Sequence, residues 1–249
     1  MNNKRIFPWI LIAAFMIVGF SIYSILKIEW KERYPGPPPN ASNFNTYELT
    51  LIDPATVLDD IRKGKKLVLQ TQPEPNPTNP PFMMPISWSQ NDFLEVAQAY
   101  GQVIWQDDLN SWHLYKILFH GDCDSSDGKF TDADFLYYQE VTKGEEDLYS
   151  VHGIELSPEY GWLTWGGDSF YPRPRFFRWA EIDKKSIVKV PAEEALTLAE
   201  QRGGSEFRKT VNNNCDISVI MWPAELQRAE WLVTYFGGST RTEIWIPAR

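Results

Sequence analysis

The chain has 249 residues, of which 43% are hydrophobic and 14% aromatic, and it carries a formal net charge of −9. This length allows one large domain or two small ones, and the composition excludes a disordered chain. The acidic balance argues against a nucleic-acid partner, which would require a basic face. Two cysteines are too few for a disulfide-built scaffold or a four-cysteine zinc site.

The N-terminal segment predicts a transmembrane signal anchor. Residues 6–26 (IFPWILIAAFMIVGFSIYSIL) carry no charge, and as a helix they would extend about 31 Å, close to the hydrocarbon thickness of a bilayer. The run is longer than the apolar region of a cleaved signal peptide, and no small-residue cleavage site follows it. We therefore expect a cytoplasmic tail at residues 1–5, a spanning helix at residues 6–28, and the lipid bilayer as the partner of residues 6–26.

Lysines and arginines lie on both sides of this helix, so they do not decide its orientation. Three other features favour a C-terminal domain outside the cytoplasm. The residues after the helix carry −11 (the total of −9 less the +2 of Lys4 and Arg5), their two cysteines could pair, and they are rich in tryptophan. We predict a single-pass protein of the cell membrane with this orientation.

A proline-rich linker at residues 29–46 follows the helix and includes the stiff run YPGPPP. The next residues predict a strand (TYELTLI), a helix from Asp53-Pro54 to Lys63-Gly64, and a second strand (KLVLQTQ). The proline-rich loop at residues 72–85 is typical of an extended surface crossing, with a docking strip for a proline-recognising partner as the alternative.

Two amphipathic helices each precede a series of strands. The first helix is expected over residues 87–100, before Gly101, and the second over residues 191–202, before Gly203-Gly204. The strands expected after the first are residues 112–119, 135–141, 150–156 and 161–165; those after the second are residues 216–221, 230–236 and 241–246, the last two joined by a turn at residues 236–239. These elements predict an α+β fold in which antiparallel sheets are each packed with a helix, in a first unit at residues 47–185 and a second at residues 186–249.

The C-terminal unit carries a family resemblance. The run VPAEEALTLAEQRGG from Val190, followed by WLVTY from Trp231 before a final strand, resembles an extracytoplasmic PepSY-type module. The resemblance covers about 60 of the 249 residues, and the closing D-x-x-T-G segment of such modules is missing, since the chain ends in IWIPAR. It implies a non-catalytic envelope module that binds or restrains other proteins, and two such units could stand in tandem.

An acidic loop is a candidate calcium site. It supplies Asp122, Asp124, Asp127 and Asp134, and Gly128 could form the turn. The spacing departs from an EF-hand, because the third acid and the glycine fall one position late and no glutamate stands at position 12. The alternative is a solvated acidic turn, and we expect no other cofactor.

The two cysteines, Cys123 and Cys215, lie in different predicted units. Outside the cytoplasm, a bridge between them would stabilise the fold by about 3–5 kcal/mol in the chain-entropy model. The alternative is that His120 and Cys123 belong to a metal site or a nucleophile pair, which would need further ligands or an orienting acid.

An aromatic-rich stretch at residues 161–179 is a candidate binding surface. Trp162, Trp165 and Tyr171, beside Asp168, could stack on sugar rings or hold a peptide. The alternative is that these side chains belong to the core, as alternate aromatic residues on strands commonly do.

The sequence contains no G-x-S-x-G, H-E-x-x-H, P-loop or G-x-G-x-x-G motif, and we predict no catalytic residue. We expect a membrane-anchored extracytoplasmic protein that binds or regulates another envelope component, either a protein or a glycan. The alternatives are a cell-envelope enzyme that acts on glycans and a calcium-stabilised structural domain.

Overall fold

The computed structural model describes residues 48–72, 88–106, 112–123, 130–172, 189–222 and 230–248. The strands are β1 (Glu48–Leu51), β2 (Thr71–Gln72), β3 (His113–Asp122), β4 (Asp132–Lys143), β5 (Glu146–Ser157), β6 (Trp162–Pro172), β7 (Asp216–Trp222), β8 (Glu230–Gly237) and β9 (Thr240–Pro247). The helices are α2 (Val57–Arg62), α3 (Gln90–Trp105), α4 (Ala192–Ala199) and α5 (Ser205–Thr210), with a π-helical turn, η4 (Glu200–Gly204), between the last two.

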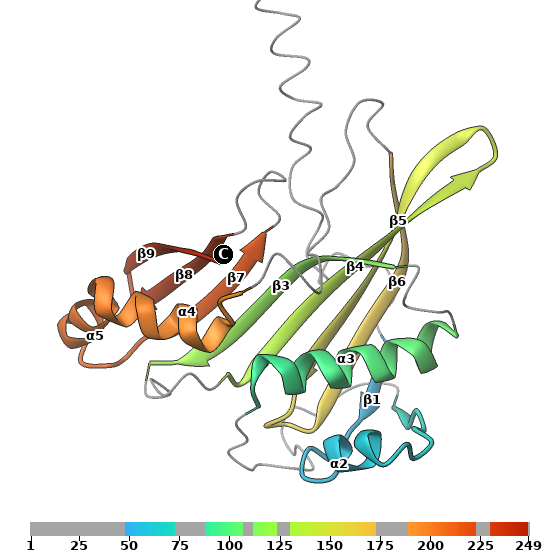
Figure 1. Cartoon of the computed structure of the whole chain (residues 1–249), viewed down its shortest axis with the longest axis horizontal. Coiled ribbons are helices and arrows are strands. Elements are labelled where there is room, and N and C mark those ends of the chain that lie inside the picture. The colour runs from blue at the N-terminus through green and yellow to red at the C-terminus, as the bar shows by residue number, and fades with distance from the viewer. Residues whose placement is uncertain are drawn as a thin grey trace, which may run out of the picture. The chain divides into compact units, whose positions relative to one another are not determined.

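All nine strands form one antiparallel sheet, in the order β2-β1-β6-β5-β4-β3-β7-β8-β9 (Figure 1). The neighbouring strands β3 and β7 join the part of the sheet from residues 47–185 to the part from residues 186–249, with Ile117 opposite Met221 and Asp122 opposite Asp216. The predicted α+β fold of separate sheets, each packed with its own helix, is therefore wrong. Hydrophobic alternation locates strands, but it does not say which distant strands will pair.

The same fold-class prediction included an N-terminal transmembrane helix. Within the described ranges, no helix is long and apolar enough to cross a membrane. The predicted tail, spanning helix and linker, at residues 1–5, 6–28 and 29–46, lie outside those ranges, as does the proline-rich loop after Gln72.

Helices α3 and α4 pack on the same face of the sheet. Phe93 and Val96 of α3 belong to one buried cluster with Ala195 of α4, and strand residues such as Phe119 and Val219 complete it. The two halves of the sheet therefore share a core and not only a backbone ladder.

The N-termini of these two helices are also linked directly. The side chain of Gln90, 8% exposed, accepts a hydrogen bond of 2.7 Å from the backbone N–H of Ala192, and the Gln90 N–H donates to the carboxylate of Glu193. Ser89 and Asp92 form a reciprocal capping box at the start of α3. Backbone N–H groups at the N-termini of both helices, which have no partner within their own helix, thus find acceptors where the two helices meet.

Candidate functional site

The predicted Cys123–Cys215 disulfide is confirmed. The two Cα atoms lie 5.2 Å apart, and the bridge joins residues separated by 92 positions. The backbone N–H of Cys123 also donates to the carbonyl of Cys215 at 2.8 Å. The bridge lies where β3 ends and β7 is about to begin, so it fixes the pair of strands that unites the sheet.

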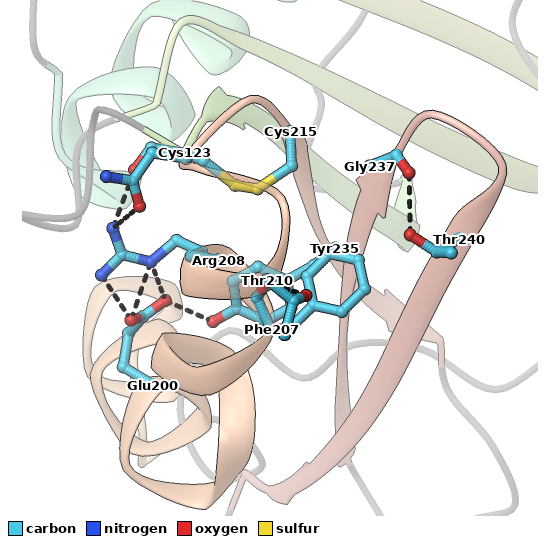
Figure 2. The surroundings of a disulfide bond; sticks show 10 residues. Cys123, Glu200, Phe207, Arg208, Thr210, Cys215, Tyr235, Gly237 and Thr240 are labelled. Carbon is cyan, nitrogen blue, oxygen red and sulfur yellow. Dashed lines mark hydrogen bonds and ion pairs between the residues drawn. A yellow bond between two sulfur atoms is a disulfide. The ribbon is translucent and has the colours of Figure 1, made fainter.

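A charged network adjoins the disulfide (Figure 2). The Arg208 guanidinium donates to the Glu200 carboxylate through Nε at 3.0 Å and Nη2 at 2.7 Å, and through Nη1 to the carbonyl oxygen of Cys123 at 3.0 Å. The Tyr235 hydroxyl donates to Glu200 Oε1 at 2.7 Å. Burial, together with this bond to a carboxylate, raises the pKa of Tyr235. Since all these groups are satisfied by one another, the network supports a structural role for the disulfide.

The candidate calcium ligands are only partly described. Asp122 ends β3 and lies opposite Asp216, whereas Asp134 lies on β4 opposite Leu118. Asp124 and Asp127 lie outside the described residues. Among those that are described, no group of three histidine, cysteine or acidic side chains is arranged to hold a metal ion. The calcium site stays a prediction.

Asp134 has a different neighbour, His120. The two side chains approach to 3.8 Å between Nε2 and Oδ2, and the interaction with Asp134 raises the pKa of His120 although burial opposes it. On the other side of β4, Glu155 of β5 accepts a hydrogen bond of 3.3 Å from Thr164. Burial, and secondarily the charge of Asp134, raise the pKa of Glu155. This acidic cluster with one histidine favours protonation at both His120 and Glu155.

The other face of the sheet, on which the helices pack, contains an aromatic pocket. Its volume is about 580 Å³, and it lies beside the C-terminal end of α3. The residues that line it are Glu48, Ile104, Trp105, Trp112, Gln139, Val141, Ser150, His152, Trp165, Gly166, Gly167 and Phe170. Aromatic rings from α3, β5 and β6, and from the segment before β3, therefore surround one cavity.

Three of these rings form a compact cluster, in which Trp105 stacks on His152 and Trp112 is tilted by 49° to His152. The His152 ring lies 4.6 Å from the centre of Trp105 and 4.1 Å from the centre of Trp112, and Trp105 and Trp112 lie 6.0 Å apart. Gly167 packs directly against the His152 ring. A Cβ at position 167 would lie 2.3 Å from His152 Nδ1. Any larger residue at position 167 would displace the imidazole.

The wall of the pocket also carries polar groups. Glu48, Gln139 and Ser150 contribute oxygen atoms, and no lysine or arginine is found among the described residues that line the pocket. The indole N–H groups of Trp105 and Trp112 are buried, and neither has a hydrogen-bond acceptor within the part of the chain that the structure describes. Because these N–H groups are closed to solvent, the polar contacts that the wall offers a ligand are its oxygen atoms.

The predicted binding residues relate to this pocket in different ways. Trp165 lines it and is only 7% exposed. Trp162 stands at the start of β6, with its ring 5.4 Å from that of Tyr160. Asp168 and Tyr171 lie on β6, but their side chains are outside the described part of the structure.

Sequence reasoning missed Trp105, Trp112 and His152. Trp105 and Trp112 lie on either side of a short polar segment, and this repeated tryptophan is the feature of the sequence that could have identified them. No protein-family model matches the chain, and no curated protein matches it. The geometry of the pocket and the disulfide are therefore the features that bear on function.

Proposed function

We propose that this chain is a binding protein of the cell envelope, attached to the membrane with its domain outside the cytoplasm, and that its aromatic pocket takes a sugar ring of an envelope glycan. The observation that carries the proposal is the pocket built around the cluster of the Trp105, His152 and Trp112 rings.

The location is supported by two features. The first is the Cys123–Cys215 disulfide, because disulfides persist in oxidising compartments and are rare in a reducing cytosol. The apolar run at residues 6–26 has the length and composition of a membrane anchor. Together they favour a domain that faces the exterior from the membrane surface.

The ligand class follows from the chemistry of the lining. At about 580 Å³ the pocket falls within the usual range of roughly 300–1,000 Å³ for small-ligand sites. The C–H face of a sugar is apolar and slightly positive, so it is attracted to the negative face of an aromatic ring. Hydroxyl groups at the sugar's edge would pair with the oxygens of Glu48 and Ser150. The described part of the lining has one carboxylate and no lysine or arginine, which favours a neutral ligand over a phosphate.

The test is isothermal titration calorimetry on the full chain, held in solution by a mild detergent. The probes are glucose, galactose, N-acetylglucosamine and the β-1,4-linked trimer of N-acetylglucosamine. We expect at least one to bind, and we expect Phe170→Ala to weaken that binding about tenfold, since losing one ring contact costs on the order of 1–2 kcal/mol. Phe170 suits the test because it is 38% exposed, so its removal leaves the core intact.

Trp245→Ala is the matched control. Trp245 is also a large exposed aromatic residue, but it lies on β9 and does not line the pocket. Binding that Trp245→Ala leaves unchanged and Phe170→Ala weakens supports the proposal. The absence of heat from every sugar, or an equal loss in the two variants, contradicts it.

A further inference from the structure

We propose that β9 pairs with β9 of a second copy of this chain, antiparallel and centred on Thr242, so that two sheets join into one. This interface is separate from the aromatic pocket and goes beyond the proposed binding function. An open sheet edge and the charges along it support this pairing.

Strand β9 is the last strand of the sheet, and no strand in the described ranges pairs with its outer edge. The side chains of Arg241 and Glu243 are 69% and 41% exposed, and Trp245 is 49% exposed. An edge of this kind presents backbone N–H and C=O groups that can add another strand.

The backbone groups that point off this edge can be identified. Arg202 of η4 donates through Nη1 to the carbonyl oxygen of Trp245 at 3.3 Å, so this oxygen faces away from β8. Because alternate residues of a strand direct their backbone groups to the same side, those of Arg241 and Glu243 face outward as well. Arg202 already covers the edge at Trp245, so the open stretch is residues 240–244.

Charge selects one register for this stretch. When β9 pairs with its own copy about Thr242, Arg241 lies opposite Glu243 of the second copy, and Glu243 opposite its Arg241. The backbone N–H and C=O groups of Arg241 and Glu243 point off the edge. Each Arg241–Glu243 pair across the interface therefore also exchanges two backbone hydrogen bonds. A register centred on Glu243 would set two glutamates against each other, and one centred on Arg241 two arginines, which is unfavourable for directly opposed residues. Arg241 and Glu243 already form an ion pair within β9, with Nη2 3.4 Å from Oε1, and the pairing about Thr242 gives each of them a second neighbour of opposite charge across the interface.

A cysteine cross-link tests this register in the full chain. Across the two-fold axis, Thr242 faces its own copy as a non-hydrogen-bonded pair, with Cα atoms about 4.5 Å apart. Two cysteines can be bridged only when their Cα atoms lie within about 7 Å. In Thr240→Cys the two copies would be about 13 Å apart, because each faces Ile244 of the partner, four residues along a strand. The native cysteines are already paired and do not interfere.

We expect Thr242→Cys to form a covalent dimer under mild oxidation at least tenfold faster than Thr240→Cys at the same concentration. Adding Glu243→Arg to Thr242→Cys should abolish that advantage, because each Arg241 would then face an arginine. Adding Arg241→Glu together with Glu243→Arg should restore it.

Equal cross-linking of the two cysteine variants would overturn the proposal, as would cross-linking that the charge substitutions leave unchanged. Circular dichroism of each variant confirms that the fold is retained. Sugar binding is measured separately, so failure of this interface does not affect the proposed function.

Discussion

Loss of the Cys123–Cys215 bridge should cost most of the stability of a typical domain. For a closed loop of 92 residues, the chain-entropy relation gives about 4.6 kcal/mol at 25 °C, because the bridge restricts the unfolded chain more than the folded one. Replacing both cysteines by alanine removes two buried sulfur atoms and adds a cavity cost of about 1 kcal/mol. Native domains have a free energy of unfolding of only about 5–15 kcal/mol, so the doubly substituted chain should be marginal.

The assay is urea unfolding of the full chain in mild detergent, followed by tryptophan fluorescence. With a slope of about 2–3 kcal/mol per molar urea, the entropic loss should lower the midpoint by about 1.5–2.3 M. Reduction of the wild-type bridge should lower the midpoint similarly, and reductant should leave the Cys123→Ala/Cys215→Ala variant unchanged. A loss below about 1 kcal/mol would refute the reasoning, because the β3–β7 junction would then hold without the bridge.

Three further predictions concern the network and the acidic cluster. Gly204→Ala should destabilise the protein by about 1–3 kcal/mol in urea unfolding, although alanine is the better helix former, because the new Cβ would lie 2.3 Å from the Tyr235 hydroxyl. The interaction with Asp134 raises the pKa of His120 in the folded protein. The stabilisation from protonated His120 is therefore complete below its unfolded-state pKa of about 6.5, and it is lost as the pH rises through its folded-state pKa. Asp134→Asn should remove this pH dependence of the free energy of unfolding between about pH 5.5 and 8.5. Glu155 also has a raised pKa, so its charge opposes folding at pH 7, and Glu155→Gln should raise the urea midpoint there and have little effect near pH 4.

Local elements of the fold were largely predictable. The expected strands at residues 216–221, 230–236 and 241–246 correspond to β7, β8 and β9, and the glycine turn between the last two is present. Their content of β-branched and aromatic residues is the physical reason, since such side chains favour strands. The expected strand at residues 66–72 is reduced to Thr71–Gln72.

The glycine stop signals had different outcomes at the two amphipathic helices. Gly101 lies inside α3, which continues to Trp105, and it is buried. Packing against the sheet there outweighs the local cost of glycine in a helix. Gly203 adopts a non-helical φ of 128°, so the chain kinks at this glycine before α5 begins, as the stop signal predicts.

The pocket and the single sheet could not be read from local pattern. Trp105, Trp112, His152 and Trp165 come from separate segments and meet only because β5 and β6 pair beside the end of α3. Likewise, the β3–β7 pairing depends on contacts between residues about a hundred positions apart. The aromatic stretch after Gly161 marked one wall of the pocket, and the rest required the three-dimensional arrangement.

The most direct test of the binding proposal is to follow the indole N–H signals of the eleven tryptophans by nuclear magnetic resonance during addition of the N-acetylglucosamine trimer. Signals are assigned with single tryptophan-to-phenylalanine variants. We expect the signals of Trp105 and Trp112 to shift in a saturable way while that of Trp245 stays in place. Unchanged pocket signals at millimolar sugar, or a shift of Trp245 alone, would contradict sugar binding in this pocket.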